Sequence, residues 1–368
     1  MSMRLRLNSL TRLAQADMVF YLLPALMALL VAGTLAQRSM GLYAAHKMFF
    51  GSFVIWAGPV PLPGGYMLIG FLTLNLAIKF IFNSEWSWRK AGIILSHLGV
   101  LVLLVGGLLT AVSAKEGFMI IGEGEGSPYI YDYHNRELSV FMGDYASMTI
   151  PFQNFINGQN SIDTLPFNFQ IQQACSNCAI IKREDAPEIK TPLQGMARFM
   201  ALETKSPATS PEENMAGIGF EISGLDKNQD GFYIAFEAMP EPITLKRGKQ
   251  NYKIMMGRQQ RTLPFRLELI DFKRETYPGM DKARAYSSAI IVHDGNLQWP
   301  ALISMNTPLR YKGYTFYQSS FEQTENGEVT VLSVVENKGR LFPYIGTLLV
   351  TAGLLLHIFI TLQKRRDT

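Results

Sequence analysis

AGIILSHLGVLVLLVGGLLTAVSA (Ala91–Ala114) and FPYIGTLLVTAGLLLHIFITL (Phe342–Leu362) are the two stretches that decide the fold. Each is apolar and long enough to cross a bilayer as a helix, which takes about 20 residues at about 1.5 Å per residue. Each carries one histidine, His97 in the first and His357 in the second. An ionisable side chain inside a membrane span indicates a function by default.

The flanking charges predict the depth of the two histidines. His97 lies seven residues after Lys90, and His357 lies seven residues before Lys364. If both cationic ends face one side of the membrane, the imidazoles lie at the same depth, about 10 Å from that edge. A neutral imidazole is a standard axial ligand of haem iron. The spacing therefore suggests one ligand held between His97 and His357, with haem b as the candidate. Two alternatives stay open: one histidine pairs with a histidine of a partner chain, or each ring only hydrogen-bonds a neighbouring helix carbonyl.

Glycines recur every seven residues on both stretches. Gly99 and Gly106 lie near one face of the first, and Gly346 and Gly353 lie near one face of the second. Small residues let helices, or a flat macrocycle, approach closely.

Composition excludes several classes of protein. The chain has 368 residues, of which 48% are hydrophobic, and a net charge of +4 with scattered basic residues, so no nucleic-acid-binding surface is indicated. Two cysteines exclude a disulfide-rich scaffold. The first apolar run is too long for a signal peptide and is predicted to be an anchor.

The fold class predicted is a membrane protein with four transmembrane α-helices, three N-terminal and one C-terminal, and a large extracytoplasmic β-rich domain of sandwich or barrel type. Basic residues cluster in the N-terminal tail, at Arg89 and Lys90, and in the C-terminal tail, so the positive-inside rule places both termini in the cytoplasm of a bacterial inner membrane. The predicted parts are a cytoplasmic tail (1–17), a three-span region (18–114) with an interfacial segment (38–65), a periplasmic domain (115–341), the fourth span (342–362) and a cytoplasmic tail (363–368).

Two segments receive a specific expectation. The interfacial segment is predicted to form an amphipathic helix from Leu42 to Trp56, before the prolines that follow. Residues 185–216 are polar and contain prolines, so they are expected to form a long exposed loop.

Other candidate ligands have weaker support. His46, His134 and His293 lack a second ligand at suitable spacing and are interpreted as structural or surface residues. Cys175 and Cys178 form CSNC, which predicts a structural disulfide in an oxidising compartment, with a redox-active pair as the alternative.

Two further patterns have competing interpretations. Residues 226–237, from Asp226 to Glu237, satisfy the calcium-loop pattern of an EF-hand, but their flanks alternate as strands do, so a polar hairpin turn is favoured. The aromatic run Tyr311–Tyr317 indicates either core packing or contact with a partner protein.

Several motifs resemble the ResB (CcsB) family of System II cytochrome c biogenesis. SHLGVLVLLVGGLL (Ser96–Leu109) is similar to the third span of that family. LPFRLELIDFKRETYPG (Leu263–Gly279) and SMNTPLRYKGYTFYQSSF (Ser304–Phe321) are similar to its outer-domain signature.

The resemblance implies a subunit of a cytochrome c synthase complex that binds and exports haem, together with a CcsA/ResC-type partner and apocytochrome c. It implies transmembrane histidines that bind haem, matched here by His97 and His357. The tryptophan-rich motif of the partner has no counterpart in this sequence, so this chain is expected to be a non-catalytic or accessory subunit. The alternatives are a bis-histidine membrane cytochrome for electron transfer and a haem-free structural assembly factor.

Overall fold

The computed structural model describes residues 17–82, 84–142, 145–210, 213–226, 228–237, 239–280, 283–324 and 327–366. Most of the predicted N-terminal tail and residues 367–368 therefore lie outside the described residues. The chain divides into a helical unit, which ends at Lys115 and resumes at Val335 with a short excursion at Tyr311–Tyr314, and a β-rich unit between them.

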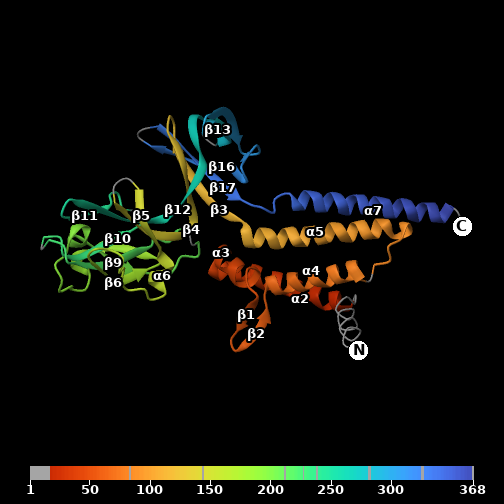
Figure 1. The fold of residues 1–368 in the computed structure, drawn as a ribbon, viewed down its shortest axis with the longest axis horizontal. Helices are drawn as coiled ribbons and strands as arrows, with labels where there is room; N and C mark the ends of the chain where they lie inside the picture. Colours follow the sequence, from red (N-terminus) through yellow and green to blue (C-terminus); the bar gives the residue numbers. More distant parts are fainter. Residues whose placement is uncertain are drawn as a thin grey trace. The chain divides into compact units, whose positions relative to one another are not determined.

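Four helices of the helical unit are long and apolar enough to cross a membrane, which indicates a membrane protein. They are α2 (Asp17–Met40), α4 (Gly65–Phe82), α5 (Ala91–Ser113) and α7 (Phe342–Arg366) (Figure 1). A short 3₁₀ helix, η2 (Trp88–Lys90), leads into α5. Three N-terminal helices and one C-terminal helix confirm the predicted arrangement, because uninterrupted apolar runs of this length leave a helix as the way to satisfy the backbone in lipid.

The segment between α2 and α4 differs from the predicted amphipathic helix. It forms α3 (Leu42–Ala45), a π-helical turn η1 (His46–Phe50) and a hairpin of β1 (Val54–Ala57) and β2 (Val60–Pro63). The helical prediction is wrong beyond Phe50, because Gly58 takes a positive φ of 63° at the hairpin turn and the prolines that follow it suit strand edges. Ile55 anchors this hairpin in a small core with Leu29 and Leu68.

The β-rich unit is built around one large sheet. Its strand order is β14-β13-β12-β4-β3-β17-β16-β15, with β11 paired to β12 and β5 paired to β4. The bounds are β3 (Lys115–Gly122), β4 (Gly126–Met142), β5 (Tyr145–Pro151), β11 (Ile243–Arg247), β12 (Gln250–Thr276), β13 (Ala283–Asp294), β14 (Leu297–Ser304), β15 (Leu309–Tyr311), β16 (Tyr314–Thr324) and β17 (Gly327–Glu336).

Smaller elements complete this unit. A three-stranded sheet has the order β10-β9-β6, and β7 pairs with β8. The bounds are α6 (Phe152–Ile156), β6 (Asn168–Cys175), β7 (Cys178–Lys182), η3 (Arg183–Asp185), η4 (Gly195–Arg198), β8 (Met200–Thr204), β9 (Gly217–Ser223) and β10 (Gly231–Phe236).

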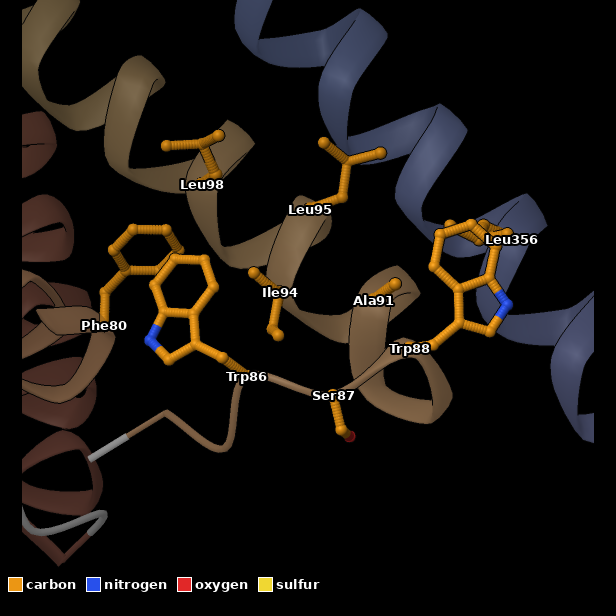
Figure 2. A pocket seen from close by; sticks show the side chains of 9 residues that line it. All are labelled: Phe80, Trp86, Ser87, Trp88, Ala91, Ile94, Leu95, Leu98 and Leu356. Carbon is orange, nitrogen blue, oxygen red and sulfur yellow. The ribbon is translucent and has the colours of Figure 1, made fainter. Parts of the chain in front are cut away.

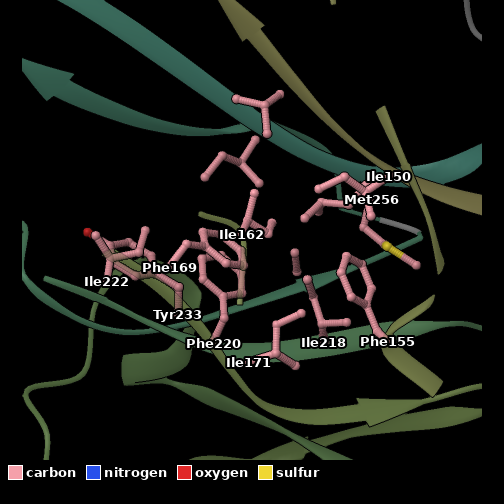
Figure 3. Packing of buried hydrophobic residues seen from close by; sticks show 14 of the residues in the cluster. Ile150, Phe155, Ile162, Phe169, Ile171, Ile218, Phe220, Ile222, Tyr233 and Met256 are labelled. Atoms are coloured by element: carbon pink, nitrogen blue, oxygen red, sulfur yellow. The ribbon is translucent and has the colours of Figure 1, made fainter. Parts of the chain in front are cut away.

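A sandwich-like core lies between the three-stranded sheet and one half of the large sheet (Figure 3). Phe169 stacks on Phe220 with ring centroids 4.3 Å apart, and Tyr233 stacks on the other side of Phe220 at 5.8 Å. Offset aromatic stacking of this kind adds about 1 kcal/mol per pair beyond the buried area. The predicted β-rich domain is therefore confirmed.

The expected loop at residues 185–216 is partly structured. It contains η4 and β8, and β8 pairs with β7 from Met200 to Thr204. Ala197 and Leu202 from this segment are buried beside the cysteine pair. The loop prediction is wrong for this part. β8 has only five residues, and its two buried residues, Ala201 and Leu202, are adjacent, so the sequence shows no alternation that would indicate a strand.

Candidate functional site

The two helices that carry His97 and His357 pack directly against each other along a line of glycines. A Cβ added at Gly99 would lie 2.7 Å from the carbonyl oxygen of Gly346, and one added at Gly353 would lie 2.5 Å from the backbone nitrogen of Ser96. Real Cβ atoms do not come this close to backbone. Glycine at these positions therefore lets α5 and α7 run side by side at backbone contact (Figure 1). We call this contact the α5–α7 seam; its glycines are Gly92, Gly99, Gly106, Gly346 and Gly353.

The seam fixes the register of the two antiparallel helices. Gly92 packs against the backbone of His357, and Gly99 packs against Gly346 and Val350. His97 lies five residues beyond Gly92, which is about 7.5 Å further along α5 and about 140° around it. The register therefore offsets the Cα atoms of His97 and His357 by about 7.5 Å along the helices, and it places His97 off the face of α5 that contacts α7.

A macrocycle held between these helices at the level of His357 does not fit the seam. Even a single Cβ at Gly92 would collide with the backbone of His357. The close approach that the glycines allow is used by helix backbone instead. Whether either histidine binds haem stays a prediction, but one haem bridging the two side chains within this seam has no space.

His97 by itself has the features of an axial ligand. Its Nδ1 lies 2.8 Å from the carbonyl oxygen of Ile93, and the side chain is half-buried. A carbonyl only accepts hydrogen bonds, so Nδ1 is the donor in this contact, and Nε2 is the ring nitrogen that this contact leaves for a ligand. Ligating histidines commonly show this arrangement, in which the second ring nitrogen donates to a carbonyl and fixes the tautomer.

The other histidines lie on other elements of the chain. His46 is exposed on η1, with its ring 5.8 Å from that of Phe50. His293 contacts Glu268 with Nε2 and Oε2 2.7 Å apart. His134 is half-buried beside Tyr133. Among the described residues, no three His, Cys, Asp or Glu side chains gather in a way that could hold a metal ion.

The two cysteines form a disulfide between the end of β6 and the start of β7. Cys175 is 1% exposed and Cys178 is 4% exposed, and both lie in a core with Phe232 and Phe236. Thiol exchange requires an accessible sulfur. The burial of both sulfurs favours the structural role over the redox role.

A charged cluster that the sequence analysis missed lies at the end of β10. Glu237 accepts from Arg136 Nε at 3.0 Å and from Arg258 Nε at 2.7 Å. Arg136 also donates to the carbonyls of His134 and Asn214. Glu237 is the last position of the calcium-loop pattern, so its carboxylate is already engaged by two guanidinium groups. The same loop forms a turn in which the carboxylate of Asp230 accepts from backbone, as expected for the hairpin interpretation.

Glu137, next to this cluster on β4, is 7% exposed. Burial raises the pKa of its carboxyl above the ordinary 4.5, although hydrogen bonds from Gln260 and Ser139 lower it in part. A raised folded-state pKa stabilises the fold below pH 4.5, and this contribution is lost as the pH rises through the folded-state value.

The Glu137→Gln substitution is expected to remove that pH dependence. Glutamine keeps an acceptor for the Gln260 amide but stays neutral at every pH. We expect the wild-type melting temperature to fall relative to the variant as the pH rises from 4.5 towards neutral, measured on the full chain in detergent. Glu203→Gln, at an exposed position on β8, is the matched control. If the melting temperatures of wild type and Glu137→Gln change by the same amount between pH 4.5 and neutral pH, the prediction is wrong.

The aromatic run near the end of the β-rich unit divides between core and surface. Phe316 is fully buried and packs edge-on against Phe265, with centroids 6.0 Å apart. Tyr317 is 39% exposed on the opposite face of β16. Core packing therefore explains Phe316, and the exposed side chain of Tyr317 stays accessible to a partner.

Comparison with known proteins connects these features to a family. Residues 236–334, from the end of β10 to β17, match the ResB-like family and contain both outer-domain motifs of the sequence. The chain is also similar to Protein NrfI of Wolinella succinogenes, with 26% identity over 299 residues. The aligned region is 79% of this chain but only 30% of NrfI, so the chain spans less than a third of that relative. The resemblance to the ResB family is therefore confirmed, and its family match lies in the second half of the β-rich unit.

Proposed function

We propose that this chain is a membrane subunit that acts in cytochrome c biogenesis. The observation that carries the proposal is the ResB-like match over residues 236–334 in a chain with four candidate membrane spans. Similarity to Protein NrfI over 79% of the chain supports it. The chain spans 30% of that relative, and we propose that a separate chain supplies the remaining part of the activity. We assign that part to a CcsA/ResC-type partner, and apocytochrome c is the client.

Haem is the proposed cargo, and His97 is the proposed first ligand. The hydrogen bond from Nδ1 to the Ile93 carbonyl supports this role, because it orients the ring and leaves Nε2 as the nitrogen that would bind iron. Since His97 points about 140° away from the α5–α7 seam, its opposite axial ligand comes from outside the seam. We propose that a histidine of the partner completes the pair. His357, whose backbone lies on the seam, is proposed as a separate ligand.

The β-rich unit is proposed to lie in the periplasm, where it scaffolds the partner and apocytochrome c. The basic residues at the ends of the spans support cytoplasmic termini in a bacterial inner membrane. The thioether bond is assigned to the partner, so no catalytic base is placed in this chain.

The experiment is a haem titration by absorbance on the chain purified with its partner. His97→Ala is expected to remove most of the co-purifying haem, and imidazole added to the buffer is expected to restore it by occupying the vacated axial position. His46→Ala, an exposed histidine of the same unit, is the matched control and should retain wild-type haem. Wild-type haem content in His97→Ala would overturn ligation by this residue. A reversible bis-imidazole spectrum from the chain without its partner would instead favour electron transfer.

A further inference from the structure

An apolar pocket of about 660 Å³ lies in the helical unit, at the end where α4 leads into α5. It is formed by the last turn of α4, the loop after it, the first turns of α5 and one residue of α7. Figure 2 shows Trp86 next to Phe80 on one side and Trp88 next to Leu356 on the other, with Leu95 of α5 between them. The Phe80 and Trp86 rings meet edge-on with centroids 5.2 Å apart.

The rim of this pocket is cationic. Trp88 is followed by Arg89 and Lys90 within the 3₁₀ helix η2, and both basic side chains are exposed. Lys90 is paired with Glu85, with Nζ and Oε2 2.5 Å apart. The single acid of the described loop residues is thus engaged by Lys90, and the net charge of this rim is positive.

We propose that the pocket binds an anionic phospholipid, with an acyl chain between Trp86 and Trp88 and the phosphate at Arg89. The pocket lies where two candidate spans end, so its natural surroundings are the boundary between acyl chains and headgroups. An apolar pocket beside a cationic rim matches a molecule that is apolar along most of its length and anionic at one end. A free phosphate would leave the aromatic walls exposed, and a neutral lipid would make no use of Arg89.

The position of the pocket gives the lipid a structural role. It contacts α4, α5 and α7, so a bound lipid joins three spans at the end where His97 lies on α5. The inference does not depend on haem binding or on the partner.

The test uses the intrinsic tryptophans. The chain has four, and Trp56→Phe with Trp299→Phe leaves Trp86 and Trp88 as the only tryptophans, which are excited selectively over the tyrosines. The full-length double variant is reconstituted in two sets of vesicles made of phosphatidylcholine and phosphatidylglycerol. In one set the phosphatidylglycerol carries brominated acyl chains, and in the other set an equal amount of the phosphatidylcholine carries them. We expect brominated phosphatidylglycerol to quench more strongly than brominated phosphatidylcholine at the same mole fraction.

Arg89→Gln is expected to lower the preference for phosphatidylglycerol by about fivefold, the usual effect of one cation at an anionic membrane surface. Arg38→Gln, an exposed arginine at the end of α2, is the matched control and should keep the preference. Equal quenching by the two brominated lipids would overturn the proposal. Quenching of both tryptophans by added protoporphyrin IX, together with equal quenching by the two brominated lipids, would overturn it in favour of a porphyrin as the occupant.

Discussion

Gly99→Val is expected to separate α5 from α7 and to cause a large loss of stability in the helical unit. A Cβ at this position would lie 2.7 Å from the Gly346 carbonyl oxygen and equally close to the backbone nitrogen of Val350. Both atoms belong to the backbone, so rotation of a side chain cannot relieve the clash. Overpacking costs about 1–3 kcal/mol where side chains can adjust. We expect Gly99→Ala to fall in that range and valine to exceed it.

The matched control is Gly107→Ala on the same helix. A Cβ at Gly107 would meet nothing within 4 Å. Alanine in a helix interior is favoured over glycine by about 0.5–1 kcal/mol, so this variant should be neutral or slightly stabilised. The measurement is thermal unfolding of the full-length chain in detergent. Equal melting temperatures for Gly99→Ala and Gly107→Ala would show that the seam is not a backbone contact.

The seam also shows how far the sequence predicts the candidate site. Apolar runs of about 20 residues determine that spans exist, and glycines seven residues apart indicate a close approach. The sequence does not determine which group packs against these glycines, because a glycine face accepts a helix as readily as a macrocycle. The structure places Gly353 against Ser96, so the second helix occupies the space.

The backbone register of the two helices differs from the register that their flanking lysines indicate. Lys90 and Lys364 indicate one membrane edge, but long cationic side chains reach the interface from different depths. The register is set by backbone contact, which puts Gly92 against His357. This leaves His97 about 7.5 Å beyond that level.

The β-rich unit was predictable as strands but not as pairings. Alternation indicates which residues share a face, and the turn between β9 and β10 was identified from its polar residues. The partner of a strand is a long-range property. β12 pairs with β4 through Lys253 and Phe141, which lie more than a hundred residues apart in the sequence. No local pattern could therefore have brought Arg136 and Arg258 to Glu237.

Glu237→Gln is expected to destabilise the β-rich unit by about 3 kcal/mol, the lower end of the range for breaking a buried ion pair by removing one partner. The substitution keeps the shape of the side chain but leaves Arg136, whose side chain is 8% exposed, beside Arg258 without the shared carboxylate. Two guanidinium groups then repel each other in a site with little water. We expect the loss in a full-chain melting experiment to change little with added salt, because buried charges are weakly screened.

The control for this prediction is Glu241→Gln, the same change at an exposed position, which should stay within about 0.5 kcal/mol of wild type. Chelation separates the ion-pair interpretation from the calcium interpretation. If Glu237 holds Arg136 and Arg258, wild type and Glu237→Gln keep the same difference in melting temperature with or without EDTA. If Glu237 closes a calcium loop, EDTA lowers the wild-type melting temperature to that of the variant. A fall of the wild-type melting temperature with EDTA would therefore contradict the interpretation that Glu237 serves to hold Arg136 and Arg258.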